Sequence, residues 1–209
     1  KTDFQLNKIN IAYCPERVIP GNTIYEMINN NRVIGGINEE SRNRSKKFYE
    51  YFCKGEIITT DANTAEMVKL AENAFRDVNI AFANELSMIC SDLKIDTEEL
   101  INIANNHPRV NILSPGCGVG GHCIAIDPWF IAAQSPNKSK LIQTARKVNN
   151  EKTKWVISKI KEQIDELSIK LSKPPIIGCL GLSFKPNIED LRESPALLIT
   201  TELIKHGYK

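Results

Sequence analysis

A glycine-rich stretch that ends in a thiol is the part of the sequence best suited to chemistry. Residues 116–123 read Gly-Cys-Gly-Val-Gly-Gly-His-Cys, and Asp127 follows Cys123 by four residues. Glycine permits backbone conformations and close approaches that a side chain would prevent. A thiol is partly ionised and strongly nucleophilic near neutral pH, so Cys123 is a candidate nucleophile for covalent catalysis.

Two other interpretations of this stretch stay open on spacing alone. The glycines could form an ordinary tight loop in which Cys123 is a small buried apolar residue. Cys117, His122 and Cys123 could instead bind a metal ion. Zinc ligands usually come as two spaced pairs, whereas His122 and Cys123 are adjacent and no second pair exists, so the metal site is the least favoured interpretation.

A polar row on a long helix is the second candidate for chemistry. Lys69, Asn73 and Arg76 stand at helical spacings of four and three residues, opposite the apolar side of the helix. Such a row is usually a solvated face. It could also line a cleft, where Lys69 would act as an acid or stabilise an oxyanion and Asn73 would hold a water molecule.

Two basic segments are candidates for anion binding. His107 and Arg109 follow a predicted helix end, and the planar guanidinium of arginine suits phosphate or sugar hydroxyl groups. Lys185 and Arg192 lie between a predicted strand and a helix N-terminus, where anions are favoured. Exposed surface turns are the alternative interpretation of both segments.

The composition is that of an ordinary globular protein. The chain has 209 residues, of which 42% are hydrophobic and 25% charged, and its net charge is +2. We therefore expect binding to neither nucleic acid nor a membrane surface. No signal-peptide core is present at the first residues, and the six cysteines are scattered without a disulfide framework, so we expect a cytoplasmic protein.

The sequence patterns predict short strands in the first third of the chain and long helices after it. Asn63 and Glu66 suggest a capping box at the start of the long helix, and Asp96 is expected to cap the next one. Ser194 and Pro195 are typical of a helix start, and Gly207 of a helix end. The remaining predicted elements are strands at 9–13, 33–36, 56–60 and 176–182 and helices at 41–53, 128–133 and 139–171.

This order predicts an α/β chain that is mainly helical. We expect the tail of an N-terminal Rossmann-like domain over 1–62 and a central helical domain over 63–172. The start of a C-terminal Rossmann-like domain follows over 173–209. A helix as long as 139–171 suggests a rod or a subunit interface. Because one strand cannot form a parallel sheet, we expect the sequence to be the middle of a longer polypeptide.

The motifs occur in the order seen in nucleotide-sugar 6-dehydrogenases, the UDP-glucose and GDP-mannose dehydrogenase family. The sequence resembles this family over nearly its whole length. It is most similar to the branch that acts on UDP-N-acetyl-D-mannosamine, through residues 75–85, 107–113 and 127–130. The family motifs lie at 14–18, 69–73, 118–123 with 127–128, and 181–185 with 190–195.

The resemblance implies a reaction that converts the C6 alcohol of a sugar to a carboxylate, with NAD as cofactor and no metal. A cysteine holds the aldehyde as a thiohemiacetal and then as a thioester, and the product serves surface polysaccharide synthesis. Cys123 matches this nucleophile, and Lys69 matches the lysine that stabilises the oxyanion. Asn73 and Asp127 match residues around the catalytic water, and Glu16 matches the glutamate that ends the NAD-binding domain.

The resemblance also implies binding residues and a homodimer through the central helices. Arg192 matches an NAD contact, and Arg109 is expected to reach the partner subunit's site. The positions that match substrate contacts are Arg17, Val18, Arg76, His107, Arg109, Gly120, Phe184 and Lys185.

Departures from the family pattern bear on the substrate and on activity. Pro20 and Ile126 stand where enzymes for UDP-glucose usually carry a glutamate and a lysine, which argues for the N-acetyl-mannosamine branch. The family's glycine-rich NAD fingerprint lies upstream of residue 1, so we expect the isolated chain to be nearly inactive. The alternatives are an enzyme for UDP-glucose or GDP-mannose, or an inactive dimerisation fragment of one.

Overall fold

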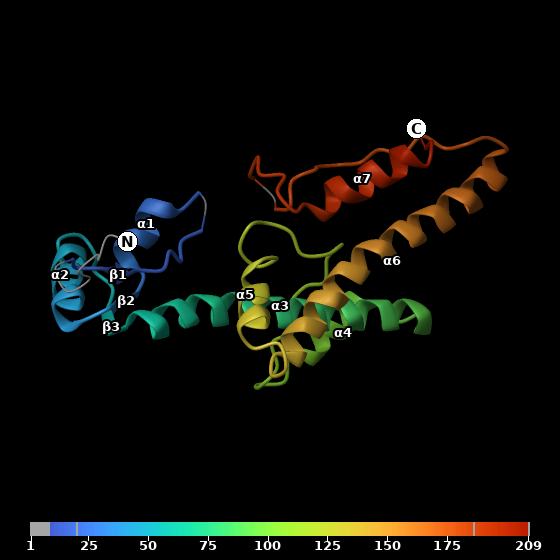
Figure 1. Ribbon diagram of the computed structural model, residues 1–209. Coiled ribbons are helices and arrows are strands. Elements are labelled where there is room, and N and C mark those ends of the chain that lie inside the picture. Colours follow the sequence, from blue (N-terminus) through green and yellow to red (C-terminus); the bar gives the residue numbers. More distant parts are fainter. Residues whose placement is uncertain (1–8, 20, 186, 209) are drawn as a thin grey trace. The chain divides into compact units, whose positions relative to one another are not determined.

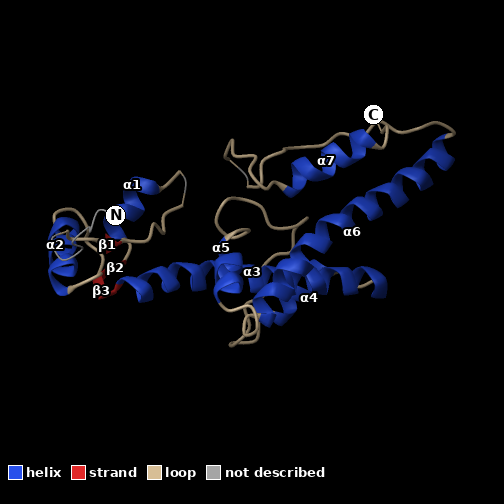
Figure 2. Ribbon diagram, viewed as in Figure 1, coloured by secondary structure: helices blue, strands red, loops and turns tan. Residues whose placement is uncertain are grey.

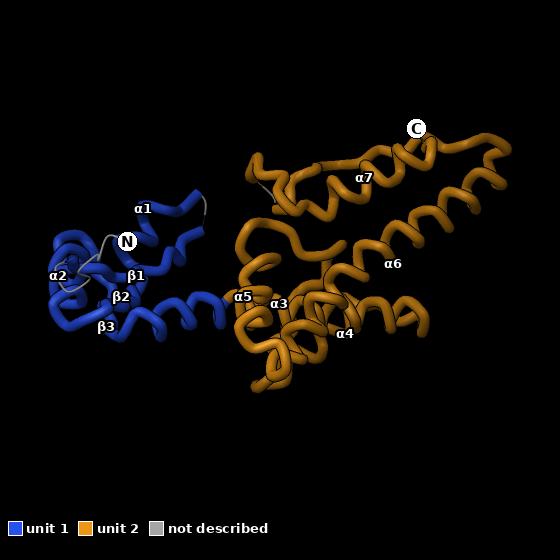
Figure 3. Tube along the Cα trace, viewed as in Figure 1, with its two compact units in different colours: residues 1–72 blue, residues 73–209 orange. Residues whose placement is uncertain are grey.

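The computed structural model describes residues 9–19, 21–185 and 187–208 (Figure 1). Pro20, one of the two positions that separate the branches of the family, lies outside the described residues. The chain divides into two compact units, residues 1–72 and residues 73–209 (Figure 3).

Unit 1 is a small sheet with two helices. Strand β2 is the centre of the sheet, with β1 antiparallel on one side and β3 parallel on the other. All five residues of β2 are buried. The elements are β1 (Ala12–Tyr13), α1 (Thr23–Asn29), β2 (Arg32–Gly36), α2 (Glu39–Glu50) and β3 (Ile57–Asp61). The strands expected at 33–36 and 56–60 and the helix at 41–53 are thus confirmed, the first strand is shorter than expected, and α1 was not predicted.

Helix α3 (Ala62–Leu93) leaves the sheet directly from β3. Asp61, the last residue of β3, accepts hydrogen bonds from the backbone N–H of Thr64 at 3.0 Å and from its hydroxyl at 2.6 Å. This carboxylate satisfies a free N–H of the first helical turn. The capping box expected from Asn63 and Glu66 is therefore wrong, because Asn63 already lies within the helix.

Unit 2 consists of helices and loops in its described part (Figure 2). Helix α6 packs against α5 and α7, and Ile164 of α6 forms an apolar cluster with Ile199 and Leu203 of α7. Besides the larger part of α3, the unit contains α4 (Thr97–Ala104), α5 (Asp127–Gln134), α6 (Lys140–Leu171) and α7 (Pro195–Lys205). Among the described residues, no helix is both long and apolar enough to cross a membrane.

Capping residues mark the helix ends of unit 2 at the positions expected from the sequence. The Asp96 carboxylate accepts from the N–H groups of Glu98 and Glu99, which begins α4 as expected. The Ser194 hydroxyl accepts from the N–H of Leu197 at 3.3 Å, with proline in the first turn of α7. Gly207 follows α7 with a φ of +82°, a left-handed conformation that glycine adopts at low cost.

The buried strand expected at residues 176–182 is wrong. These residues are not in a strand, and Ile176 and Leu180 are 88% and 98% exposed. A strand needs a neighbour that satisfies its backbone hydrogen bonds, and a parallel neighbour needs a crossover connection. The apolar run carries the composition of a buried strand, but no described strand pairs with it.

Within unit 2, the buried face of helix α3 consists of small and polar residues rather than large apolar ones. Asn73, Asp77 and Asn84 are at most 5% exposed, whereas Phe75 and Phe82 are 69% and 55% exposed. The helix is amphipathic, as expected. The apolar period alone does not reveal which of its two faces meets the rest of the chain.

A buried polar ladder joins α3 to α6. It consists of Asp77 and Asn84 on α3 and Arg146 and Asn149 on α6, each at most 3% exposed. Arg146 Nη1 and Asn149 Nδ2 donate to Asp77 Oδ1 at 2.6 and 2.8 Å, and Asn84 Nδ2 donates to Asn149 Oδ1 at 2.9 Å. Burial raises the pKa of the Asp77 carboxyl, and the Arg146 guanidinium opposes this rise.

Removal of the Arg146 charge is expected to destabilise unit 2 strongly. Arg146→Met leaves the Asp77 carboxylate buried without its cation, which typically costs about 3–5 kcal/mol. The free energy of unfolding from urea titrations followed by circular dichroism measures this cost. Lys147→Met, at the exposed neighbouring position on α6, is the control and should change stability little. Equal losses in the two variants would contradict the role of the ladder.

Candidate active site

The loop of residues 116–123 leads from an irregular segment into helix α5. Because it carries the candidate nucleophile Cys123, it is called the nucleophile loop below. Cys123 is half-buried at its end. The Cys123 carbonyl accepts from the N–H groups of Ile126 and Asp127, at 3.0 and 2.8 Å, and this turn starts α5. Pro128 is buried in the first turn of α5, where its missing N–H has no cost. The thiol is therefore held next to the start of a helix.

Two of the expected catalytic residues meet at this helix start. Asn73 Nδ2 donates to Asp127 Oδ2 at 2.5 Å, which joins α3 to α5. Asn73 is 5% exposed, so its side chain is held in one orientation. A hydrogen-bonded amide and carboxylate can orient a water molecule and accept its proton. These residues are the ones assigned to the catalytic water from the sequence.

Residues 182–185 and 187–195, here called the covering segment, pack against the nucleophile loop and explain two of its glycines. The N–H of Gly121 donates to the Arg192 carbonyl at 3.1 Å. A Cβ atom at Gly120 would lie 2.5 Å from the Glu193 carbonyl oxygen and 2.7 Å from Phe184 Cβ. Gly121 has a φ of +87° and lies against the Phe184 ring. No larger residue fits at these positions without moving the covering segment.

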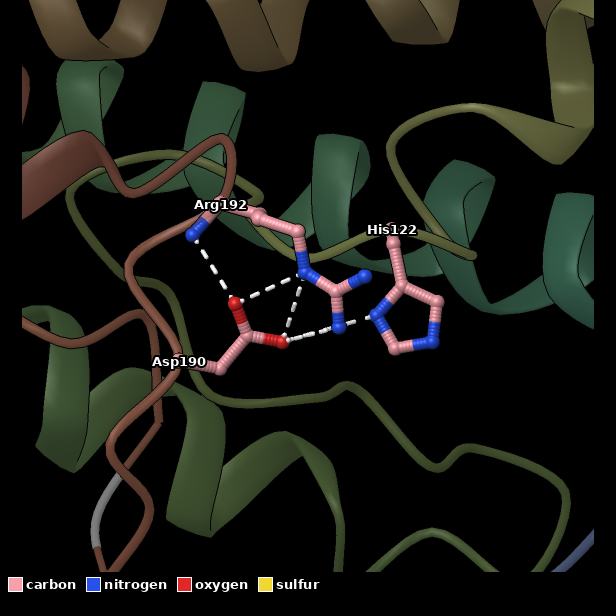
Figure 4. Close-up of polar contacts among 3 residues, drawn as sticks. All are labelled: His122, Asp190 and Arg192. Carbon is pink, nitrogen blue, oxygen red and sulfur yellow. Dashed lines mark hydrogen bonds and ion pairs between the residues drawn. The ribbon is translucent and has the colours of Figure 1, made fainter.

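An ion pair lies at the junction of the loop and this segment (Figure 4). The Arg192 guanidinium donates to the Asp190 carboxylate from Nε at 2.9 Å and from Nη2 at 2.6 Å. His122 Nδ1 lies 3.6 Å from the same carboxylate. These bonds, first of all those from Arg192, hold the pKa of Asp190 well below its usual value. The Asp190 carboxylate in turn raises the pKa of Arg192, with a smaller contribution from Cys123.

The two cysteines of the loop have different surroundings. Cys117 packs against the cluster of Ile164, Ile199 and Leu203, and burial raises the pKa of its thiol. A raised pKa leaves less thiolate at neutral pH, so Cys117 is poorly suited to be a nucleophile. Among the described residues, no group of three or more His, Cys, Asp or Glu side chains is placed to hold a metal ion.

The remaining catalytic candidates gather in unit 1. Lys69 Nζ donates to the Glu16 carbonyl oxygen at 2.7 Å, and Glu16 Oε1 accepts from the N–H groups of Arg17 and Val18. Arg17 forms an ion pair with Glu72 at 2.7 Å. Glu72 was not singled out from the sequence, although it lies inside the 69–73 motif. Its pairing with Arg17 orients a guanidinium expected to contact substrate.

Four other expected substrate residues have exposed side chains. Arg76 is exposed on α3, and Lys185 is exposed in the covering segment. His107 and Arg109 lie in the turn after α4, where Arg109 Nη2 is 3.4 Å from His107 Nε2. Exposed cationic groups of this kind are available to an anionic ligand.

The Asp190 carboxylate is expected to stay ionised where an ordinary aspartate takes up a proton. Its lowered pKa means that the contact with Arg192 persists when the pH falls below the usual value of 3.8, and is lost only as the pH falls through the lower value. A carboxyl-carbon NMR titration of the chain measures this midpoint. Arg192→Gln should return it toward the usual value, and a midpoint at or above 3.8 in the unaltered chain would contradict the geometry.

Comparison with protein families gives three matches, in order along the chain. Residues 1–53 match the NAD binding domain of the UDP-glucose/GDP-mannose dehydrogenase family. Residues 63–151 match the central domain of this family, and residues 178–209 match its UDP binding domain. Together, the matched segments contain the nucleophile loop, the covering segment and the interacting residues of unit 1, which are Glu16, Arg17, Lys69 and Glu72.

Named relatives agree with these matches. The chain is 56% identical to the UDP-N-acetyl-D-mannosamine dehydrogenase of Campylobacter jejuni over 95% of its length and 48% of the relative. It is 53% identical to the NDP-N-acetyl-D-galactosaminuronic acid dehydrogenase of Ralstonia nicotianae, over 94% of its length and 45% of the relative. The chain thus spans about half the length of the relatives it matches.

A solved structure shares the same fold. The UDP-D-ManNAc dehydrogenase of Pyrococcus horikoshii matches with a TM-score of 0.87 and 43% identity, over 95% of this chain and 47% of that one. This match agrees with the mainly helical α/β fold class expected from the sequence. The chain belongs to the UDP-glucose/GDP-mannose dehydrogenase family.

Proposed function

We propose that the chain is the middle part of an NAD-dependent nucleotide-sugar 6-dehydrogenase that oxidises UDP-N-acetyl-D-mannosamine. The observation that carries this proposal is the half-buried Cys123 beside the Asn73–Asp127 pair, at the end of a glycine loop in a chain of this family. Residues 1–62 end the NAD-binding domain, residues 63–172 form the central domain, and residues 173–209 begin the UDP-binding domain.

The reaction removes four electrons from carbon 6 of the sugar. Loss of a hydride and a proton turns the alcohol into an aldehyde. The Cys123 sulfur then adds to the carbonyl carbon, and the oxygen takes up a proton to give a thiohemiacetal. Loss of a second hydride and proton leaves a thioester. Water attacks this ester, the carbon–sulfur bond breaks, and the carboxylate and the free thiol are released.

Each catalytic residue has a role that fits its chemistry. The Lys69 ammonium stabilises the negative charge that develops on the substrate oxygen. Asp127 and Asn73 hold the attacking water, and Asp127 takes its proton. Glu16 orients the segment that carries Arg17, because its carboxylate binds the N–H groups of Arg17 and Val18.

The described residues fit NAD through Arg192. Its guanidinium is 64% exposed beside the nucleophile loop and has the charge and planar donors that suit a pyrophosphate. NAD, when bound, accepts the hydride lost at carbon 6 in each oxidation. Asp190 restricts the orientation of the guanidinium, so Arg192 meets an anionic ligand with little loss of side-chain entropy.

The identity of the sugar in the substrate is the most specific part of the proposal. Ile126, at the start of α5, supplies an apolar side chain where enzymes for UDP-glucose usually carry a lysine, which favours a substrate with an acetamido group. The relative from Ralstonia nicotianae is nearly as similar as the one from Campylobacter jejuni, so an N-acetyl-galactosamine derivative is the second candidate. The residues proposed to bind the substrate are Arg17, Val18, Arg76, His107, Arg109, Gly120, Phe184 and Lys185.

A homodimer through the central helices is part of the proposal. Phe75, Phe82 and Ile89 follow one another by seven residues on α3 and are 69%, 55% and 49% exposed. Large apolar side chains in such a row favour a partner surface over water. Arg109 would extend into the partner's site.

All six cysteines are free, which is consistent with a cytoplasmic enzyme.

Loss of the Cys123 thiol is expected to abolish acid formation. In the full-length protein, Cys123→Ala should lower the formation of the sugar acid from UDP-N-acetyl-D-mannosamine, quantified by mass spectrometry, by at least about a thousandfold, because no thioester forms for water to cleave. The first oxidation precedes the addition of the thiol, so NADH alone is not the readout. Cys117→Ala is the matched control in the same loop and should keep most of the activity. Acid formation that survives in Cys123→Ala would refute the assignment, and a preference of the unaltered protein for another nucleotide sugar in the same assay would change the substrate.

A charge on the apolar row of α3 is expected to weaken the dimer. Phe82→Glu places a carboxylate in the proposed contact, and its desolvation opposes association. Sedimentation equilibrium of the chain should show a dissociation constant raised at least about tenfold. Glu85→Gln, at an exposed polar position of α3, should leave it unchanged. A chain that is monomeric before substitution would contradict the proposed dimer.

A further inference from the structure

The nucleophile loop is attached at its first residues to the helices beneath it. The N–H of Gly116 donates to Asn84 Oδ1 at 2.8 Å, and Thr153 Oγ1 of α6 donates to the Cys117 carbonyl at 2.7 Å. Both side chains are at most 5% exposed. A Cβ atom at Gly118 would collide with the Thr153 hydroxyl, so the backbone of the loop lies directly on this residue. Two buried groups therefore tether the loop.

The α3–α6 ladder fixes the orientation of the Asn84 tether. Asp77 Oδ1 accepts, so Asn149 must turn its NH₂ toward it and its carbonyl oxygen toward Asn84. Asn84 must then donate to Asn149, and this leaves its own oxygen facing the Gly116 N–H. If the Asn84 amide were flipped, its oxygen would face the Asn149 oxygen and its NH₂ would face the Gly116 N–H, so neither hydrogen bond could form. The Asp77–Arg146 pair thus determines how the loop is held.

A glycine-rich loop needs such tethers more than an ordinary loop does. Glycine has more backbone freedom to lose than any other residue, so the loop samples many conformations unless specific bonds hold it. At its other end it is held by the bond from Gly121 to the Arg192 carbonyl. The tethers at both ends limit the positions that the Cys123 thiol can occupy.

We propose that Asn84 and Thr153 are positioning residues for the Cys123 thiol, acting through the backbone of the nucleophile loop. The proposal rests on the role of Cys123 proposed above. In physical terms, the two hydrogen bonds keep the loop closed against α3 and α6 and keep the Cys123 thiol half-buried. Loss of either tether increases the time that the loop spends open.

Thr153→Val tests the proposal with little disturbance of packing, because it replaces a hydroxyl by a methyl group of similar size. The chain is treated with iodoacetamide, and the modified cysteines are quantified by peptide mass spectrometry. A hydrogen bond is worth about 1 kcal/mol, so alkylation of Cys123 should become about fivefold faster if loop opening limits it. Thr153→Ser keeps the hydroxyl and should restore the original rate.

Two other cysteines serve as internal references. Cys179 is exposed and reports the reactivity of an open thiol, whereas Cys90 is 1% exposed on α3 and reports general unfolding of unit 2. The proposal requires Cys123 to react faster in Thr153→Val while the rates of Cys90 and Cys179 stay constant. Parallel increases at Cys90 and Cys123 would mean a merely structural role and overturn it, as would an unchanged rate at Cys123.

A control substitution and a second variant complete the test. Thr200→Val makes the same change at a hydroxyl that donates to the Ala196 carbonyl at 2.9 Å within α7, and should not accelerate Cys123. Asn84→Leu removes the other tether and should accelerate Cys123 at least as much as Thr153→Val does. If Asn84→Leu does not fold, the comparison of Thr153→Val with Thr153→Ser decides alone. Because alkylation needs no turnover, this result is independent of the activity assay that tests the proposed function.

Discussion

The architecture of unit 2 depends on one buried charge pair. Asp77 and Arg146 bring a carboxylate and a guanidinium out of water between α3 and α6, and their mutual attraction opposes the cost of this desolvation. Asp77 Oδ2 and Arg146 Nε are buried without a hydrogen-bond partner among the described residues, so the pair relies on the bonds that its other atoms make. Asn149 and Asn84 extend the pair into a chain of directed hydrogen bonds. Apolar packing alone would let the two helices slide, whereas directed bonds specify one register.

This constraint connects the interior of the unit to its chemistry. The polar side of α3 that carries Asp77 and Asn84 also carries Asn73, which binds Asp127 at the start of α5. The same helix therefore supports the nucleophile loop at one end through Asn84 and fixes the helix that follows the loop through Asn73. With the buried side engaged in this way, the large apolar side chains Phe75 and Phe82 of α3 remain exposed.

Local signals in the sequence predicted the helices better than they predicted the packing. Asp96 and Ser194 cap their helices as expected, because a cap depends only on neighbouring residues. The strand expected at 176–182 and the buried side of α3 depend on partners that no local pattern contains. The Asn73–Asp127 pair was anticipated from the resemblance to a family. The ladder was missed because polar residues at helical spacing usually indicate a solvated face, although Asp77 and Asn84 lie seven residues apart, as stacked neighbours on a helix do.

The most direct test of the account is to look for the substrate on the thiol itself. The full-length protein, mixed with NAD and UDP-N-acetyl-D-mannosamine and quenched in acid during turnover, should yield a Cys123 peptide that carries the acyl group of the sugar. Its mass should shift again when the ester is cleaved with hydroxylamine. Turnover without any such adduct on Cys123, or an adduct on Cys117 instead, would contradict the central claim that the glycine loop exists to hold this nucleophile.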